Sequence, residues 1–534
     1  MPESTRSRHA SRRALTATIL AASLTVALAA PAGAATSTSI GPNTVTAPYI
    51  LPVADGVHIE SLLTVGDAGA ASNGYEMVGI PDGLGVMRQG ANLVLYMNQE
   101  LRDTQGIARR HGQTGAFVSR WVIDAEQGRI KEGSDLIDPG VLFWDYPSGT
   151  YVTTGARWAD GTLQDPTFGR FCSGTLSNPD LFYNESTKNG YKGQIYFGNE
   201  EDGDVGRAFG VTKDGAATAL PRLGLFSWEN TVPAPNDSDT TLVMGQEDGP
   251  GNGSQPWVYV GTKQRGGPPV AKAGLTNGDD HVLDAVDQAV SNDAQWRATY
   301  GKGVAAPVRI VDNDWNQTGA EQNSDALADG LSLNRIEDGH WDPLNKNDFY
   351  FLTTEGGQNN GENPTGPLYR DGGGLWRLRW ADIENPDLGA TLTLLLDGSE
   401  LPGGEVGLHK PDNMTIDAHG NLLIQEDPGN VNHLARIVAY RISDGALGVI
   451  ARFDANLFAA GATADPTKFT IDEESSGIID TEDFLGAGTF LFDAQVHTVK
   501  HLPAGTGPGT VQEFVENGQL LSLRVDAWSD IYGD

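Results

Sequence analysis

The stretch NMTIDAHGNLLIQEDPG, residues Asn413–Gly429, decides the fold class of this chain. A short apolar strand reaches a turn at Ala418–Asn421, and a second apolar strand then ends in acids. An arginine-bearing strand, Arg436–Tyr440, follows. Three short strands separated by Gly, Asn and Asp predict one blade of a β-propeller, in which a blade takes about 40–45 residues.

The acidic ending of that second strand recurs along the chain. In each case an apolar strand leads into an amide or small polar residue and then into acids. The clear examples are LVLYMNQE (ending at Glu100), QIYFGNEED (Asp202), LVMGQED (Asp248) and LLIQED (Asp427), and the looser ones are FYFLTTE (Glu355) and FLFDAQVH (with Asp493).

Acids after strands are common turn residues, and this remains the alternative for any one of them. As a set, however, the acid-tipped strands suggest a shared site. The innermost strands of a propeller line a central channel, so their ends meet at one mouth. Carboxylates brought together there need cations, because like charges in one site oppose each other's ionisation. The repeated ending therefore predicts a metal site.

The whole chain fits an all-β fold with a few short helices. Strands bounded by Gly, Asn and Asp dominate, and strong helical periodicity is scarce. We expect helices only at Asp280–Val290 with a continuation to Trp296, at Ala381–Asn385 and at Asp454–Ala460. Uneven spacing of the acid-tipped strands favours a six-bladed propeller with large loop insertions. A seven-bladed propeller or a pair of β-sandwiches remains open.

The first 34 residues have the pattern of an export signal. Arg12-Arg13 precedes an apolar run that ends at the small residues Ala32–Ala34, which indicates a twin-arginine (Tat) signal peptide. A general secretory signal is the alternative. We expect residues 35–534 to form a single propeller catalytic domain. The protein would interact with the Tat export machinery and would then be a secreted or periplasmic monomer.

Charge and hydropathy narrow the class of partner. The net charge is −34, which opposes binding to nucleic acid and to anionic lipid. Beyond the signal, no run approaches the ~18 apolar residues of a membrane span. We expect a small-molecule partner, no nucleic acid and no membrane span.

Cys172 is the only cysteine, so it forms no internal disulfide. It lies in Gly169–Gly174, where glycines allow a close backbone approach. Its own context leaves two possibilities open: a small buried apolar residue, or a thiolate with a chemical role.

Several motifs are distinctive as an ordered set. They are Asn98–Glu100, Arg170–Gly174, Gly198–Glu201, Glu337–Gly339 with Trp341–Pro343, and Pro411–Asn413 with Gly420-Asn421. Together, and in this order from about residue 90 to about residue 500, they resemble the motifs of the PhoX-type alkaline phosphatases. This family has Tat signals, a propeller fold and an active site of ferric iron and calcium that hydrolyses phosphate monoesters.

The resemblance implies a role for particular residues. Cys172 would hold iron as a thiolate. Arg335 would bind the substrate phosphate, and Glu337 would be a metal ligand; we expect both to be catalytic. The other metal ligands that the resemblance implies are Glu100, Glu200, Glu201, Glu229, Glu247, Asp248, Asp412 and Asp427. Asp472–Ser476 (DEESS) would form a calcium loop.

This chain also departs from the family pattern. Gln99 and Trp228 stand where the family usually has histidine, and Asn199 stands where it often has cysteine. If these positions do not contact the metal, the site is kept; if any is a direct ligand, its replacement favours a calcium-only site, because calcium prefers oxygen ligands. We expect a metal-dependent phosphatase with Ca2+ and Fe3+, calcium being the better supported. The alternatives are a calcium-dependent lactonase or esterase and a non-catalytic calcium-stabilised propeller.

Overall fold

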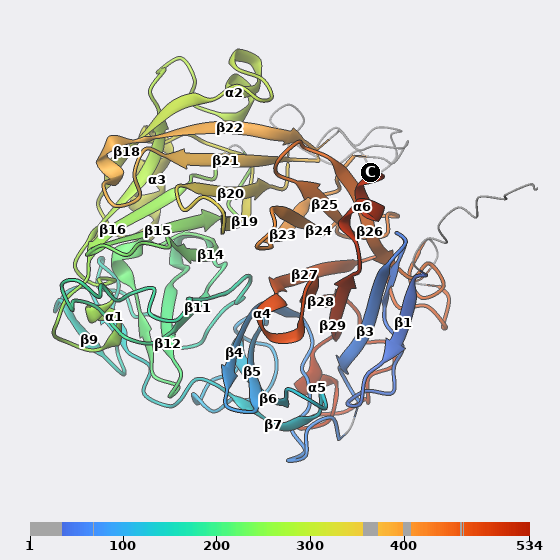
Figure 1. Ribbon diagram of the computed structural model, residues 1–534. Coiled ribbons are helices and arrows are strands. Elements are labelled where there is room, and N and C mark those ends of the chain that lie inside the picture. Colours follow the sequence, from blue (N-terminus) through green and yellow to red (C-terminus); the bar gives the residue numbers. More distant parts are fainter. Residues whose placement is uncertain are drawn as a thin grey trace, which may run out of the picture.

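Antiparallel sheets surround a central axis in the computed structural model of the protein (Figure 1). The structure describes residues 35–67, 69–251, 253–355, 372–398, 407–459, 462 and 464–534. Six described strands contact one another in turn and close a ring around the axis. They are β4 (Pro81–Gln89), β10 (Thr175–Leu176), β14 (Trp228–Pro233), β19 (Ile336–Trp341), β23 (Pro411–Ile416) and β27 (Glu473–Asp480).

Each of these inner strands begins a series of hydrogen-bonded strands that runs outward. The first two series are β4 with β5 (Asn92–Gln99), β6 (Phe117–Asp124) and β7 (Ile130–Asp135), and β10 with β11 (Ile195–Asn199), β12 (Ala208–Thr212) and β13 (Ala217–Ala219). The hairpin of β8 (Phe143–Asp145) and β9 (Thr150–Val152) lies between them in sequence.

Two neighbouring series join at their outer edges into one sheet, through the pairing of β18 with β22. One half is β14, β15 (Thr240–Glu247), β16 (Trp257–Thr262), β17 (Asp279–Ala285) and β18 (Ala306–Asn313). The other half is β19, β20 (Asp348–Thr353), β21 (Gly374–Trp380) and β22 (Ala390–Asp397).

The chain ends close the ring. N-terminal strands β3 (Val57–Thr64) and β1 (Ser37–Ile40) extend the series of β27, β28 (Thr489–Val496) and C-terminal β29 (Asn517–Val525), as Figure 1 shows in blue beside red. Strand β2 (Ile50–Pro52) extends the series of β23, β24 (Asn421–Glu426), β25 (Arg436–Arg441) and β26 (Leu447–Phe453). Pairing the first strands with the last joins the two ends of the chain in the ring.

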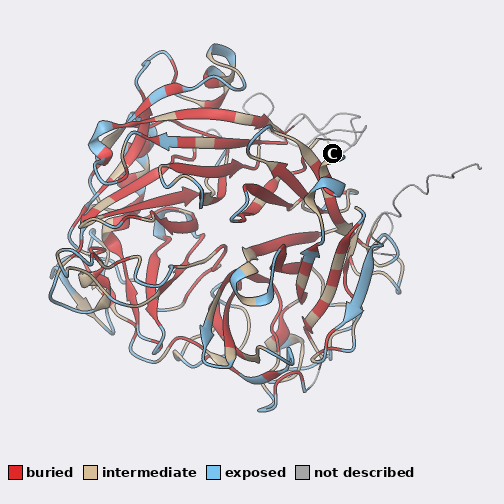
Figure 2. Cartoon of the chain, viewed as in Figure 1, coloured by how far each residue is buried: buried red, intermediate tan, exposed pale blue. Residues whose placement is uncertain are grey.

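The predicted all-β class and propeller arrangement are therefore confirmed, and the predicted strands around residues 413–440 are β23, β24 and β25. The inner faces of the sheets are buried (Figure 2). Among the described residues, no helix has the length and apolar character needed to span a membrane. Residues 1–34, where the export signal is predicted, lie outside the described chain.

The helix predictions were mostly wrong. Asp280–Val290 is largely strand β17, because cross-strand pairing with β16 and β18 outweighs local helical preference. Ala381–Asn385 is a turn before the 3-10 helix η3 (Pro386–Leu388), and the described residues of Asp454–Ala460 form turns. Only the continuation to Trp296 is helical. The described helices are α1 (Pro269–Lys272), α2 (Asp293–Thr299), α3 (Gly319–Asp329), α4 (Glu482–Leu485), α5 (Val511–Phe514) and α6 (Trp528–Tyr532), with 3-10 turns η1 (Gly203–Val205) and η2 (Pro221–Leu223).

Candidate metal centre

A chemically reactive side chain stands at the start of every inner strand. In five strands it is an acid at the second position, and before β10 it is Cys172. The inner strands surround the axis, and all of them start at the same end of the ring. Their first side chains therefore converge at one mouth. The five acids are Asp82, Glu229, Glu337, Asp412 and Glu474.

The acid-tipped strands predicted from sequence are a different set. They are β5, β11, β15, β20, β24 and β28, which pair with the inner strands as the second strand of each series. The expectation that they are innermost was wrong. Their ends still reach the mouth because the pairing is antiparallel: Pro81 is opposite Gln99, and Pro411 is opposite Glu426.

A repeated backbone irregularity aims the inner acids. The ladder shifts register just after the start of β4, β14, β19 and β23. Such bulges re-aim side chains and are common beside active sites. In addition, the residue two positions before the reactive side chain has a left-handed φ at Ile80 (+52°), Arg170 (+36°), Arg335 (+54°) and Lys410 (+45°). A non-glycine residue is strained in this backbone conformation, and such strained residues are common at functional sites.

Three overlapping groups of side chains could each hold a cation. The first contains Asp82, Glu100 and Cys172, and the second contains Cys172, Glu201 and Glu229. The third contains Glu229, Glu337 and Asp412. Within each group the candidate ligand atoms lie within 4.8 Å of one another. Cys172 and Glu229 are shared, so the groups form one continuous centre.

Neutral polar side chains connect these groups. Ser173 Oγ donates to Glu229 Oε1 at 2.6 Å, and Asn413 Nδ2 donates to Ser173 Oγ at 2.5 Å. Gln495 Nε2 lies 3.2 Å from Asp82 Oδ2 and 3.1 Å from Glu100 Oε2. All these side chains are buried. The network orients the carboxylates without neutralising them.

The clustering of acids disfavours their ionised forms. Burial, together with the nearby carboxylates of Asp248 and Asp338, raises the pKa of Glu229 to about 8, although hydrogen bonds from Cys172 and Ser173 oppose the shift. Burial likewise raises the pKa of Asp82 and of Glu337 well above the usual range, and neighbouring acids add to both. The Cys172 thiol has a raised pKa for the same two reasons. A bound cation would reverse this preference, because it attracts the charged form of each ligand.

The donor set suits metal ions. Three buried oxygens at the third group, Glu337 Oε1, Asp412 Oδ1 and Asn413 Oδ1, have no hydrogen-bond partner within the described chain. Buried polar atoms are rarely left unpaired. Carboxylate and amide oxygens are the ligands calcium prefers, and the thiolate form of Cys172 would add a softer ligand suited to a transition metal.

Arg335 lies at this centre in a pair with Asp248. Its Nε and Nη2 donate to the two carboxylate oxygens of Asp248, each at 2.7 Å, and its Nη2 is 3.6 Å from Glu337 Oε1. The Arg335 side chain keeps 26% of its exposure. It therefore stands beside the third group with one edge turned to solvent.

Four predicted ligands lie outside the three groups: Asp248 is paired with Arg335 at the centre, and the other three have partners elsewhere. Glu200 pairs with Arg207, and Glu247 accepts from the Gln255 backbone and the Trp257 indole. Neither belongs to the three groups, nor does Asp427, which accepts from the Gly429 backbone. The run Asp472–Ser476 was expected to be a loop but mostly lies in strand β27, where Glu474 faces the centre: burial and the charges of Asp427 and Glu100 raise its pKa to about 7.

The residues that depart from the family pattern have structural contacts. Trp228 stacks on Phe226 with ring centroids 3.9 Å apart, in the buried core. Asn199 Oδ1 accepts from Thr231 Oγ1 at 2.6 Å, and Gln99 Nε2 donates to the Asn98 carbonyl at 2.8 Å. Trp228 therefore packs in the core, whereas its neighbour Glu229 accepts a hydrogen bond from Ser173 at the centre.

Sequence reasoning missed Asp82 as a site residue. It stands in Pro81-Asp82-Gly83, which is typical of a turn. One signal was available: β23 also begins with Pro-Asp, at Pro411-Asp412, and Asp412 was predicted. The repeated dipeptide at two strand starts would have pointed to both.

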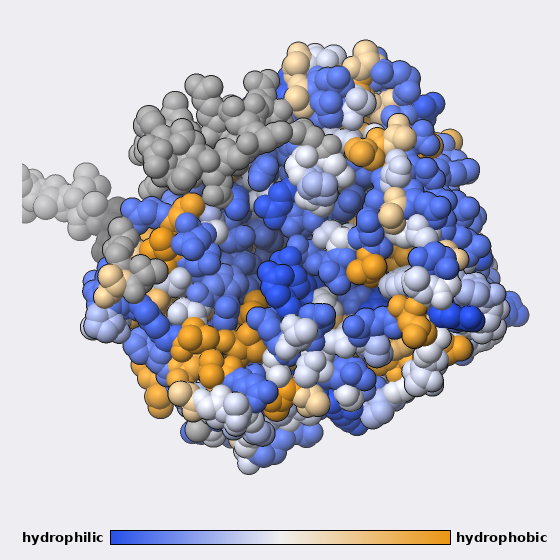
Figure 3. All heavy atoms as spheres, turned by 180° about the vertical axis from the view of Figure 1, so that it is seen from behind, coloured by the Kyte–Doolittle hydropathy of each residue, from blue (hydrophilic) through white to orange (hydrophobic). Residues whose placement is uncertain are grey.

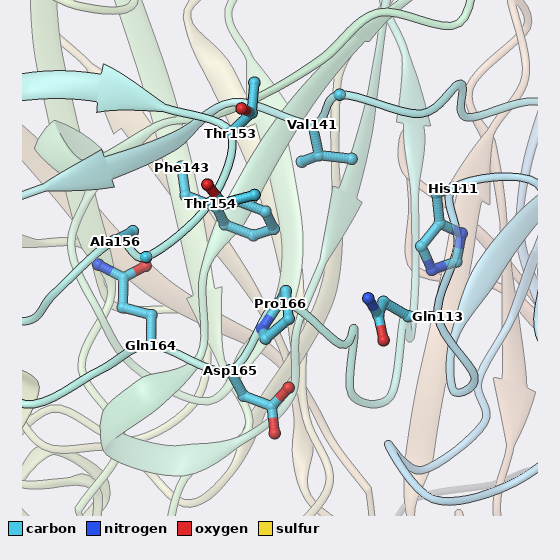
Figure 4. Close-up of a pocket in the computed structure, with 12 residues that line it drawn as sticks. His111, Gln113, Val141, Phe143, Thr153, Thr154, Ala156, Gln164, Asp165 and Pro166 are labelled. Carbon is cyan, nitrogen blue, oxygen red and sulfur yellow. The ribbon is translucent and has the colours of Figure 1, made fainter.

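The surface offers two other features. Hydrophilic residues surround a hollow near the middle of the face in Figure 3. Separately, a cavity of about 430 Å³ is lined by His111, Gln113, Phe143 and Asp165, among others (Figure 4). None of the predicted site residues lines this cavity.

Comparison with known proteins identifies relatives. The family model for alkaline phosphatase PhoX matches residues 211–479. The solved structure of Pseudomonas fluorescens PhoX in complex with vanadate, a transition state analogue, is similar with a TM-score of 0.56 at 13% identity, over 91% of this chain and 98% of that one. A putative 6-phosphogluconolactonase from Bacteroides uniformis reaches a TM-score of only 0.27 at 13% identity, over 67% and 80%. No curated protein matches the sequence.

Proposed function

Because the chain belongs to the PhoX alkaline phosphatase family, we propose that it is a metal-dependent phosphatase that hydrolyses phosphate monoesters. The observation that carries the proposal is the placement of Arg335 beside the third of three overlapping groups that could each hold a cation. Hydrolysis of a phosphate ester needs positive charge around the transferring group and a fixed orientation. This centre offers both.

We propose calcium and ferric iron as the metals, with calcium the better supported. Asp82, Glu100 and Cys172 would hold one cation, Cys172, Glu201 and Glu229 a second, and Glu229, Glu337 and Asp412 a third. When bound, such cations supply Lewis-acid stabilisation of phosphate oxygens. Three other acids would stabilise the loops around the centre through their hydrogen bonds. They are Glu200, Glu247 and Asp427.

The chain's own residues would orient the substrate. Asp248 fixes the plane of the Arg335 guanidinium by its bidentate pair. The Nη1 group has no acceptor within the described residues, so it can donate to a phosphate oxygen. Glu337 limits how far the guanidinium can move and shares the adjacent cation group.

We further propose that the protein is exported through the twin-arginine pathway and acts as a secreted or periplasmic monomer. The support is the sequence pattern at residues 1–34 and the strongly acidic composition.

Elemental analysis of the protein as isolated, with a p-nitrophenyl phosphate assay before and after EGTA, tests the proposal. We expect bound calcium, hydrolysis that EGTA abolishes, and recovery on adding calcium. Visible absorption from an iron–thiolate contact would support iron. A metal-free protein with no phosphatase activity would contradict the proposal, and hydrolysis of lactones instead would favour the alternative enzyme class.

A further inference from the structure

Arg170 and Arg335 occupy equivalent positions in two different blades. Each stands two residues before a residue of the metal centre, each has a left-handed backbone, and each guanidinium contacts an acid at the end of a second strand. Their side chains keep 35% and 26% of their exposure. The similarity raises the question of whether both bind substrate.

The contacts of Arg170 differ from those of Arg335. Its Nε and Nη2 lie 2.9 and 2.6 Å from Glu100 Oε1, while its Nη1 and Nη2 lie 2.7 and 2.6 Å from the two oxygens of Glu201. The backbone joins the same two segments: the Arg170 amide donates to the Leu101 carbonyl at 2.8 Å, and the Arg170 carbonyl accepts from the Glu201 amide at 3.0 Å.

The number of free N–H donors distinguishes Arg170 from Arg335. A guanidinium has five N–H groups in a rigid fork. In Arg170 all three nitrogens contact carboxylates, so little capacity is left for a substrate. In Arg335 the pair with Asp248 uses Nε and Nη2 only. Arg335 is therefore suited to bind phosphate, whereas Arg170 is suited to hold acids.

We propose that Arg170 is a positioning residue that sets the distance between the two cation groups on either side of Cys172. Glu100 belongs to the group with Asp82, and Glu201 belongs to the group with Glu229. The two groups share only Cys172, so the Arg170 fork is a second physical link between them. This inference rests on the proposed function.

Arg170→Lys tests it, because lysine keeps the charge but cannot form the fork to both carboxylates. We expect metal affinity and kcat to fall about 10–100-fold, as for other partners of metal ligands, while KM for p-nitrophenyl phosphate stays within about twofold. Well below the melting temperature, excess calcium should restore part of kcat, whereas a merely destabilised variant would already be folded there and show no loss to restore. The melting temperature is measured alongside.

Arg379→Lys is the matched control. Arg379 forms a similar fork to Asp348, at 2.6 and 2.5 Å, but Asp348 begins β20 and so lies at the opposite end from the centre. This control should keep wild-type metal affinity and kcat. An Arg170→Lys variant with wild-type metal affinity, or with a loss confined to KM, would overturn the positioning role. Failure of the proposed function looks different: the wild-type protein would itself lack metal and activity.

Discussion

The Cys172 thiol lies 3.4 Å from Oδ2 of Asp82, although 90 positions separate the two residues in sequence. One residue comes from the loop before β10 and the other from the start of β4, so neighbouring blades meet at this contact. Both side chains are buried, and both have a raised pKa. A cation bound between these two groups would stabilise the ionised form of each, which burial alone disfavours.

Cys172→Ser tests the thiolate. A metal-bound sulfur is a stronger ligand than a hydroxyl, so we expect activity to fall by about 100-fold or more and any visible absorption to disappear. The fold should persist, because serine is close in size. Absorption spectra, metal analysis and circular dichroism check this. Full activity in the variant would make Cys172 a packing residue.

Asp82→Asn tests a candidate ligand that the sequence did not reveal. The amide keeps the shape but removes the charge, so we expect lower metal content and a matching loss of activity. Asp280→Asn is the matched control: Asp280 is fully buried, like Asp82, but it lies on β17 outside the centre. Equal metal loss in both variants would contradict a specific role for Asp82.

Arg335→Ala tests the phosphate contact. A hydrogen bond to a charged group contributes about 1.5–3 kcal/mol, so kcat/KM for phosphate monoesters should fall about 10–100-fold. Metal content should stay unchanged. A lower melting temperature with unchanged kcat/KM would show instead that Arg335 is a structural partner of Asp248.

Glu337→Gln should have the opposite signature, because Glu337 belongs to a cation group. We expect metal content to fall first and activity to follow it, with partial recovery in excess calcium. Kinetics and elemental analysis on the same preparation check this. A loss of kcat/KM at full metal content would move Glu337 from metal binding to substrate contact.

Removing the metal should make stability depend on pH in a particular direction. Burial and neighbouring acids raise the folded-state pKa of Glu229 to about 8 and of Glu474 to about 7, above the ordinary glutamate value. The folded state then binds more protons than the unfolded state between about pH 4.5 and 8, so stability falls as pH rises through that window.

Thermal melts in EDTA check this pH dependence. The melting temperature of the metal-free protein should fall between about pH 5 and 8, and saturating calcium should raise it most at pH 8, because metal bound only to the folded state stabilises it. Identical melts with EDTA and with calcium at pH 8 would mean that these acids hold no metal.

The sequence by itself determined the strand content and the chemical character of the site. Short apolar strands with Gly, Asn and Asp turns specify sheets because these patterns are local, and the acid endings of Glu100, Glu201 and Asp248 are visible one strand at a time. The resemblance to the family, and not a local pattern, marked Cys172, Arg335, Glu337 and Asp412 as candidates.

Only the tertiary structure decided which residues meet. Whether a strand is innermost or second depends on pairing between distant segments, so Asp82 was missed. Pairing with β16 and β18 likewise made a strand of most of Asp280–Val290, which was predicted as a helix. Which side chains face the centre also depends on β-bulges and on residues with a left-handed φ, because both change the direction of the side chain that follows. Glu200 and Glu247 have the same local pattern as Glu201 and Asp248, yet side-chain alternation turns them to Arg207 and Trp257, because successive residues of a strand face opposite sides.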